Sequence, residues 1–329
     1  MKAFIYKLHF TAPLQVNSDP LSLEKSEVMI HSDTLFSAIA NSYAALFEAD
    51  EGFFKDPPFL ISSAFPFYKN TLFIKTIPVK WNIDSESREK FRKKIKKTEF
   101  IPIEMLKKVI SQEKITINEN SFKQEFFQED IDGPIYTVSE RPHSSVSNST
   151  GETHIFYTSS VSFSKDAGLY FLVQFKDEAE KKRFDAAMYL LSDTGIGGKR
   201  SSGHGMFKTE EGGTFQWSYK EGEDYFINIS LYHPTEREIK NGLLQNARFV
   251  TINRQNWVFS NGVARPVRSK SVRMFTEGSI LKNTEGAEGD IPDVTPEIPQ
   301  EIGRITHRIY RYGKLFKLPV PAPPDGGEK

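Results

Sequence analysis

The chain has 329 residues, and its 43 basic and 43 acidic side chains cancel, so the overall charge favours no polyanionic partner. Cysteine is absent, which excludes disulfides, thiolate metal sites and cysteine nucleophiles and is compatible with a reducing cytosol. No run of about 18 apolar residues occurs and Lys7 interrupts the apolar N-terminus, so we expect a cytoplasmic protein without a membrane span or signal peptide.

The first elements in chain order predict an α+β unit. The opening residues alternate, which predicts a strand with Phe4, Tyr6, Leu8 and Phe10 on one face. A helix should follow from an N-cap at Ser32 or Asp33, bury apolar residues at three-to-four spacing, and end near Gly52. Strands are expected at 59–68 and 71–80.

An insertion follows these strands. Residues 88–97 hold seven basic residues and one acid and predict a short helix, which either contacts RNA or faces solvent. Residues 135–139 and 154–163 predict a long hairpin joined by a turn at 147–152, with Arg141 and His143 on its approach. A strand at 168–175 and a helix at 177–192 complete the unit.

A glycine-rich loop connects that helix to a strand expected at 203–210. Five of its eleven residues, 195–205, are glycines, and Lys199, Arg200, Ser201 and Ser202 lie between them. Glycine allows close backbone approach, while N–H groups, hydroxyls and cations supply donors for anionic oxygens. The loop therefore predicts phosphate binding, and a helix C-cap at Gly195 followed by a turn is the alternative.

Two common nucleotide motifs do not fit this loop. A Walker loop needs Ser or Thr after its Lys and runs from a strand into a helix, whereas Arg200 follows Lys199 and the order here is reversed. A dinucleotide fingerprint would need a glycine at the position of Arg200.

The second half of the chain has a similar order of elements. Its expected elements are a strand at 225–232, a short helix at 235–244, strands at 247–259 and 263–275, and a last strand at 307–318. We therefore predict two α+β domains: residues 1–212, with an insertion at about 80–165, and residues 213–320. Residues 321–329 are expected to be a disordered tail.

Charge is unevenly distributed in this half. Residues 239–276 contain no acid and carry a net charge of +7, residues 277–301 carry −6, and residues 302–320 carry +5. We expect the acidic stretch to be a solvated loop between two basic segments. The basic side chains either form a binding surface or are scattered over exposed strand faces.

Three motifs together resemble a known family: IHSDTLFSAI at 30–39, GIGGKRSSGHGMF at 195–207, and HRIYRYGKLFKLPV at 307–320. They are similar to the RAMP superfamily of CRISPR proteins, and more narrowly to the subunit-four family of type III-A Csm effector complexes. The resemblance is weakest at 80–130 and 277–301. It implies a prokaryotic, cytoplasmic protein with two tandem ferredoxin-like, RRM-like domains, a glycine-rich loop and a β-hairpin thumb.

The resemblance also implies a role. The family's subunit is non-catalytic, holds the single-stranded 5′ tag of the CRISPR RNA (crRNA), and bridges the large polymerase-like subunit to the backbone RAMP subunit. Carried over by position, or by charge for the last three, the RNA-binding residues are His31, Ser32, Asp33, Thr34, Arg141, His143, Gly195, Gly197, Gly198, Lys199, Arg200, Ser201, Ser202, Gly203, Arg265, Arg268 and Lys270. The thumb turn here lacks the Arg usual in the family. We expect no cofactor and no protein-built metal site.

Three other functions stay open on the sequence alone. In a RAMP-type endoribonuclease that processes crRNA, His31 or His204 would be the general acid or base, although neither has an obvious acidic partner in sequence. Metal-assisted target cleavage would instead depend on Asp33. The chain could also be an assembly adaptor whose basic segments bind an acidic protein surface.

Overall fold

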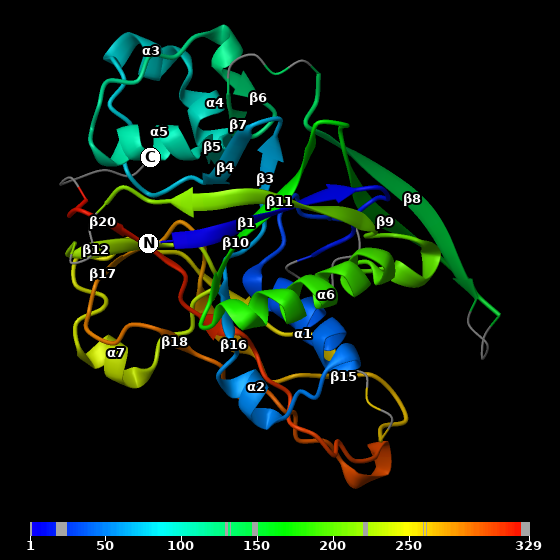
Figure 1. Cartoon of the computed structure of the whole chain (residues 1–329). Helices are drawn as coiled ribbons and strands as arrows, with labels where there is room; N and C mark the ends of the chain where they lie inside the picture. Colours follow the sequence, from blue (N-terminus) through cyan, green and yellow to red (C-terminus); the bar gives the residue numbers. More distant parts are fainter. Residues whose placement is uncertain are drawn as a thin grey trace.

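The computed structural model describes residues 2–17, 25–128, 131, 133–146, 151–219, 223–258, 260 and 262–323. Within these residues a nine-stranded sheet forms the centre of the molecule (Figure 1). Its order is β11 (Phe207–Gln216), β1 (Lys2–Phe10), β10 (Ala167–Phe175), β3 (Phe65–Tyr68), β4 (Thr71–Lys75), β5 (Phe100–Pro102), β7 (Phe126–Phe127) and β6 (Phe122–Lys123), and β2 (Phe59–Ile61) also pairs with β10.

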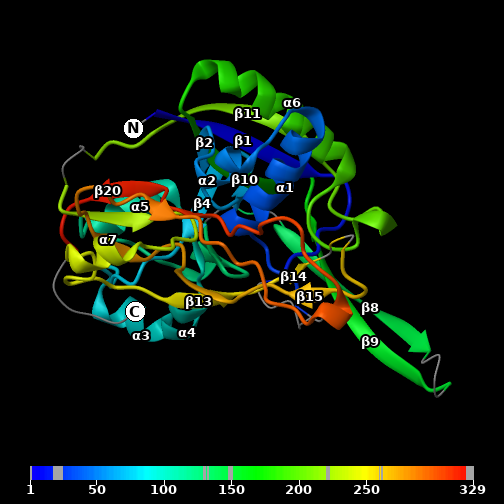
Figure 2. The same cartoon turned by 90° about the horizontal axis from the view of Figure 1, so that it is seen from below.

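The central strands form a βαββαβ unit. Helix α1 (Ser32–Leu46) connects β1 to β2 and β3, and α6 (Glu178–Thr194) connects β10 to β11. All neighbours among these strands are antiparallel. Both helices lie side by side on one face of the sheet (Figures 1 and 2). The arrangement is that of a split βαβ fold, and the predicted opening strand, the strand at 168–175 and the helix at 177–192 are confirmed within a few residues.

Both faces of the sheet are buried. Tyr6 and Leu8 pack with α1 and α6, whereas Ala3 and Ile5 face a second core shared with the insertion and the C-terminal strands. Strand β10 contributes to both cores, which explains why its sequence is continuously apolar instead of alternating.

The insertion between β4 and the hairpin packs on the second face. The predicted helix at 88–97 is present as two short helices, α3 (Ser85–Lys90) and α4 (Arg92–Lys97). Phe91 and Ile95 are buried, as their spacing requires. Sequence reasoning missed α5 (Ile103–Ile110), whose apolar face carries the buried Leu106. Lys90 and Lys94 form exposed ion pairs with Glu119, so part of this basic segment is a solvated face.

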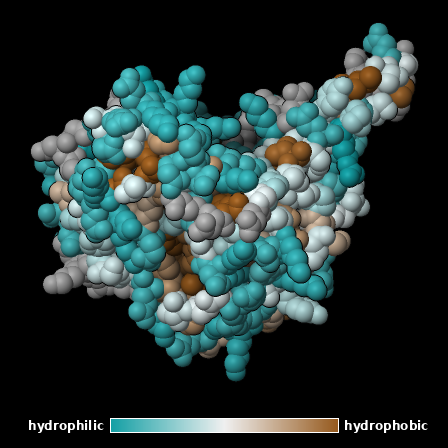
Figure 3. Space-filling model, turned by 90° about the horizontal axis from the view of Figure 1, so that it is seen from above, coloured by the Kyte–Doolittle hydropathy of each residue, from teal (hydrophilic) through white to brown (hydrophobic). Residues whose placement is uncertain are grey.

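The predicted hairpin is confirmed. Strands β8 (Tyr136–Val146) and β9 (Thr153–Phe163) pair in register along their whole length. The hairpin stands clear of the body in Figures 1 and 3, and its outer part exposes Val146 and Ile155. The first four residues of the predicted turn, 147–150, lie outside the described residues.

The second half is less regular than predicted. Strand β12 (Tyr225–Asn228) lies between β17 (Ile280–Lys282) and β20 (Lys317–Val320). Three two-stranded sheets pair β13 (Thr251–Arg254) with β16 (Val272–Phe275), β14 (Trp257–Val258) with β15 (Val267–Arg268), and β18 (Gly289–Asp290) with β19 (Gly313–Lys314). Helix α7 (Glu236–Lys240) is short because Gly242 takes a φ of 92° just after it. The α+β class is correct, but a second ferredoxin-like unit is not confirmed.

The two halves share one hydrophobic core. Tyr225, Ile227 and Phe316 belong to the same buried cluster as Ala3 and Ile5. Strand β11 continues past the predicted boundary at 212 as far as Gln216, so the first unit includes this longer strand. Of the predicted tail, residues 321–323 have neither helix nor strand, and 324–329 lie outside the described residues.

The predicted ends of α1 are wrong. Its N-cap is His31, which makes no side-chain cap hydrogen bond, and the helix ends at Leu46. Gly52 lies in a separate helix, α2 (Glu51–Lys55). Ser32 and Asp33 do not cap α1 because their side chains bind the C-terminal half: the Leu231 N–H donates to Ser32 Oγ at 2.9 Å.

Asp33 is the centre of a buried ion cluster. Arg254 Nε and Nη2 donate to the two carboxylate oxygens at 3.0 Å each, and Arg311 Nη1 donates to Oδ2 at 2.9 Å. All three side chains are buried. Burial alone raises the pKa of Asp33, but the two guanidinium charges outweigh it and hold the pKa well below its usual range.

A second buried pair lies beside it. His31 Nδ1 is 2.8 Å from Glu277 Oε1, and Ser63 Oγ also donates to Glu277. Glu277 was predicted to lie in a solvated acidic loop; it is buried instead, because His31 and Ser63 hydrogen-bond to its carboxylate. Burial lowers the pKa of His31, but the charge of Glu277 and the hydrogen bonds to Glu27 and Glu277 raise it to about 9. Burial raises the pKa of Glu277, but His31 lowers it to about 2.

We expect Asp33→Ala to destabilise the protein by about 3–5 kcal/mol, because it leaves two buried guanidinium groups without their carboxylate. The control is Glu236→Ala, which breaks an exposed ion pair with Lys240 and should change the free energy of unfolding by less than about 1 kcal/mol. Chemical denaturation of both variants measures the difference. Equal losses in the two variants would contradict a structural role for the cluster.

Stability should also depend on pH through His31. Its pKa in the folded state, about 9, exceeds the ordinary value of 6.5, so its contribution is fully present below pH 6.5 and is lost as the pH rises through 9. The Glu277 contribution is present above pH 4.5 and is lost as the pH falls toward 2. Denaturation at pH 6 and pH 9.5 should show a loss on the order of 1–3 kcal/mol that His31→Gln abolishes.

Candidate nucleic-acid interface

The glycine-rich loop is held by backbone contacts with residues 13–15. Gly205 N–H donates to Pro13 O at 2.9 Å and Gly198 N–H donates to Gln15 O at 2.8 Å. Leu14, between them, pairs with Val161 at the base of the hairpin. One short segment therefore fixes both the loop and the thumb. Sequence reasoning assigned these residues no role.

Several glycines are required by the fold of the loop itself. Gly195 caps α6 with a φ of 76° and its N–H donates to Leu191 O, so the C-cap alternative is correct for this residue. A Cβ on Gly197 would lie 2.3 Å from Gln15 O, and one on Gly205 would lie 1.9 Å from Ile196 O. Because glycine has no Cβ, the loop backbone packs directly against other backbone at these positions. The cations Lys199 and Arg200 then lie at the rim of the loop.

The cationic residues lie in a tight turn. Lys199 has a left-handed backbone with φ 54° and precedes a single 3₁₀ turn over Arg200–Ser202. The N–H groups of Lys199, Arg200 and Ser201 have no acceptor in the part of the chain that the structure describes. Arg200, Ser201 and Ser202 are exposed. The turn thus offers free backbone donors next to two positive charges, which suits an anionic ligand.

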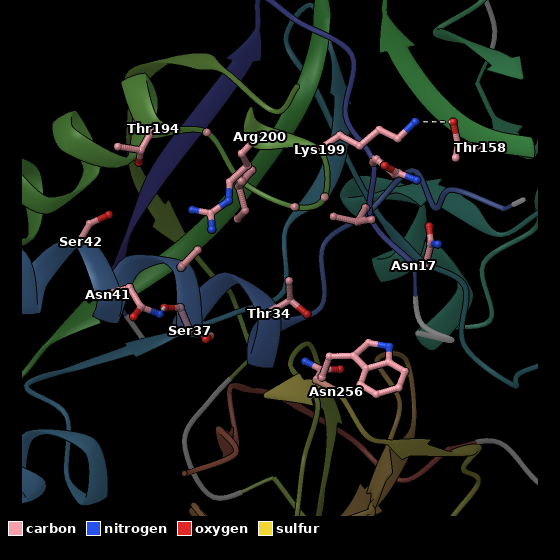
Figure 4. Close-up of a pocket in the computed structure, with 18 of the residues that line it drawn as sticks. Asn17, Thr34, Ser37, Asn41, Ser42, Thr158, Thr194, Lys199, Arg200 and Asn256 are labelled. Atoms are coloured by element: carbon pink, nitrogen blue, oxygen red, sulfur yellow. Dashed lines mark hydrogen bonds between the residues drawn. The ribbon is translucent and has the colours of Figure 1, made fainter. Parts of the chain in front are cut away.

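This turn borders a groove of about 830 Å³ (Figure 4). The groove joins the loop, the polar face of α1, the inner side of the hairpin and the start of β14. Its polar and charged lining includes Gln15, Asn17, Thr34, Ser37, Asn41, Thr158, Thr194, Lys199, Arg200 and Asn256. The sequence-predicted loop and thumb therefore meet at one surface.

The two cations of the loop differ in their contacts. Lys199 Nζ lies 2.7 Å from Thr158 Oγ1 and 2.6 Å from His143 Nε2, so it connects the loop to the thumb. A charged ammonium only donates, so His143 Nε2 accepts in this contact. Arg200 extends in another direction, toward α1 (Figure 4). The His143 ring also stacks on Phe156, with ring centroids 5.4 Å apart.

The other predicted RNA-binding residues of the first half fall into two groups. Thr34, Gly195, Gly197 and Gly198 line the groove; Ser201, Ser202 and Gly203 continue the loop at its edge; and Arg141 is exposed two residues before His143 on β8. His31, Ser32 and Asp33 do not reach the groove, because all three side chains are buried in contacts with other parts of the chain. The geometry gives these three a structural role.

The candidates for catalysis are poorly placed for it. His31 is buried against Glu277, and the two Asp33 oxygens are occupied by arginines. His204 Nδ1 lies 3.3 Å from Ser202 O, and no carboxylate contacts its ring among the described residues. Within those residues, no group of three His, Cys, Asp or Glu side chains is arranged to hold a metal ion.

The basic residues of the second half surround another hollow. Arg265 and Arg268 line a cavity of about 690 Å³ together with Trp257, which also lines the groove. Lys270 lies outside it and pairs with Glu297 of its wall at 3.2 Å. Sequence reasoning missed Trp257. The signal that could have indicated it is a single Trp within a basic segment that contains no acid.

Sequence reasoning also missed the polar face of α1. Ser37 and Asn41 line the groove, one helical turn apart on the side opposite the buried Phe36 and Ile39. The signal that could have indicated them is their spacing of four residues, which places both on one face of a helix.

In the described part of the chain, no helix has the length and hydropathy required to cross a membrane.

Comparisons with known proteins show which proteins the chain resembles. Residues 221–320 match the model of the CRISPR Csm4 C-terminal domain. The chain is 26% identical over 308 residues to the CRISPR system Cms protein Csm4 of Thermococcus onnurineus, covering 89% of this chain and 92% of that protein. It is 22% identical over 331 residues to the same-named protein of Streptococcus thermophilus, covering 96% and 99%.

Solved structures show the same fold. A crystal structure of a Csm3–Csm4 subcomplex of the type III-A CRISPR–Cas interference complex matches with a TM-score of 0.64 and 19% identity, covering 98% of this chain and 100% of that one. A Csm1–Csm4 cassette crystallised with cA4 matches with a TM-score of 0.60 and 20% identity, covering 99% and 100%.

The chain is thus an α+β protein that resembles proteins of CRISPR systems over nearly its whole length. Among these it is similar to Csm4 proteins, and its residues 221–320 match the Csm4 C-terminal domain. The resemblance inferred from the three sequence motifs is thereby confirmed.

Two glycine substitutions should separate backbone strain from steric clash in the loop. Gly203 and Gly205 have similar φ values, 78° and 75°, but a Cβ on Gly203 meets nothing within 4 Å. We expect Gly203→Ala to cost about 1 kcal/mol through the left-handed backbone alone, and Gly205→Ala to cost about 1–3 kcal/mol more. Denaturant titration measures both, and equal costs would contradict the packing role of Gly205.

Proposed function

We propose that the chain is a non-catalytic RNA-binding subunit of a type III-A CRISPR effector complex. It holds the 5′ tag of the crRNA and bridges the large polymerase-like subunit to the backbone RAMP subunit in the prokaryotic cytoplasm. The observation that carries the RNA-binding part is the groove, where Lys199 and Arg200 face the polar side of α1 and the thumb. The similarity to Csm4 proteins, which have been crystallised with Csm1 and with Csm3, supports the place in the complex.

The groove suits a single strand of RNA. Cations, hydroxyls and free backbone N–H groups bind phosphate and ribose without depending on base sequence. Asn41 and Asn256 add amide groups that can hydrogen-bond to base edges. The binding is therefore dominated by the backbone of the RNA, and any preference for the tag comes from bases turned toward the polar lining.

The state of the candidate residues supports a non-catalytic role. His31 and Asp33 are buried in ion pairs, and breaking either pair to reach RNA would expose an uncompensated buried charge. His204 is near the groove, but no described carboxylate orients its ring. The geometry supports a binding subunit, and no cofactor or metal is needed for that role.

The affinity for single-stranded RNA should fall with salt in a way that Lys199 and Arg200 determine. If each neutralises one phosphate, replacing both with Ala should reduce the slope of log affinity against log salt by about 1.4. The matched control is Lys240→Ala on α7, which Figure 1 shows well away from the hairpin of β8 and β9, and this variant should leave the slope unchanged. A slope that is the same in the double variant and the native protein would remove both residues from the site.

Purification of the tagged protein from its native cells tests the role in the complex. Retained RNAs should share one repeat-derived 5′ end, and mass spectrometry should find a large polymerase-like protein and other RAMP subunits. Recovery of those proteins without RNA would favour the adaptor function. A lone protein carrying trimmed repeat RNA would favour crRNA processing instead, and recovery of neither would contradict the proposal.

A further inference from the structure

We propose that Trp257 is a stacking platform for one base of the bound RNA, and that Arg265 and Arg268 hold the adjoining phosphate in the hollow beside it. This inference rests on the proposed function, because it extends the path of the same RNA strand beyond the groove at the glycine-rich loop. The ligand is a nucleotide of single-stranded RNA whose base is turned out of the strand.

The Trp257 ring is presented by a small hairpin. Strand β14 places Trp257 directly opposite Arg268 of β15, and the guanidinium carbon lies 5.0 Å from the ring centroid. This cation–π contact covers the ring on one side and fixes its orientation. The side chain nevertheless remains 43% exposed, whereas Trp81 and Trp217 are only 3% and 5% exposed. An indole held in place and left open to solvent is suited to stack with a ligand.

The position of Trp257 connects two hollows. It lines the groove of about 830 Å³ that contains Lys199 and Arg200, and it also lines the hollow of about 690 Å³ that contains Arg265 and Arg268. A strand whose phosphates contact the glycine-rich loop therefore reaches the second hollow by passing this ring. A base stacked there continues the path from one basic site to the next.

The lining of the second hollow favours RNA over an acidic peptide. It combines two arginines with apolar walls from Pro266, Ile298 and Ile302. Its acid, Glu297, already binds Lys270 at 3.2 Å, which offsets its charge. The phosphate of RNA and the carboxylate of an acidic peptide would both pair with the arginines. Only RNA also has a nucleobase that would stack on the open face of the Trp257 ring beside these apolar walls. Single-strand binding sites generally combine these features.

Tryptophan fluorescence tests the proposal directly, because Trp257 is the exposed member of the three tryptophans in the chain. A short single-stranded RNA of mixed sequence is titrated into the full-length protein at fixed salt. We expect quenching that Trp257→Phe abolishes while the affinity is largely kept. Trp257→Ala should weaken binding roughly tenfold without changing the salt slope, since no phosphate contact is lost.

Arg268→Ala is the complementary variant and should lower the salt slope by about 0.7. Circular dichroism and thermal melting check that each variant is folded. Quenching is also measured on the native protein, so this part of the test does not depend on the folding of any variant. RNA binding that depends on Lys199 and Arg200 but causes no quenching would overturn the platform and leave the proposed function standing. Absence of any RNA binding would overturn both. Loss of a partner protein from Trp257→Ala, with unchanged RNA affinity, would assign the ring to a protein contact and overturn the platform.

Discussion

The structure depends on one carboxylate. Asp33, at the first turn of α1, binds arginines from two distant parts of the second half, and neither end of this contact is exposed. The same Arg254 also donates to Thr34 Oγ1, on the wall of the groove, at 3.1 Å. The cluster therefore fixes the start of α1 relative to Asn256 and Trp257, which follow Arg254 closely in the chain. The shape of the candidate RNA surface is a consequence of this buried ion cluster, which reaches that surface through the contact between Arg254 and Thr34.

Local patterns predicted the elements of the first half well, because their cause is local. Apolar residues alternate in β1, recur at helical spacing in α6 and run continuously in β10, and each pattern indicates which faces are buried. The start of α1 and the burial of Glu277 could not be predicted in this way. In both cases the deciding partner lies more than 190 residues away: Leu231 for Ser32, and His31 for Glu277. A carboxylate in an acidic stretch is indistinguishable in sequence from one that has a buried histidine partner.

The candidate site was predicted in part for the same reason. The cations and glycines of the loop are adjacent in sequence, so they were found together. The motif at 30–39 was also found, but its most polar residues face the core, and the groove is lined by the next turns of the helix, at Ser37 and Asn41. Segment 13–15, which holds both loop and thumb, contributes backbone groups, and backbone contacts leave no signature in side-chain identity.

The shared core has a consequence for synthesis of the chain. Phe316, Leu318 and Val320 fill the same cluster as Ala3 and Ile5, and β20 completes the sheet around β12. During translation, the part of the second face that these residues cover therefore stays open until β20 has left the ribosome. Until then, the apolar side chains there are available to chaperones or to misassociation with neighbouring chains. Packing of β20 is thus a late step that closes the core shared by the two halves.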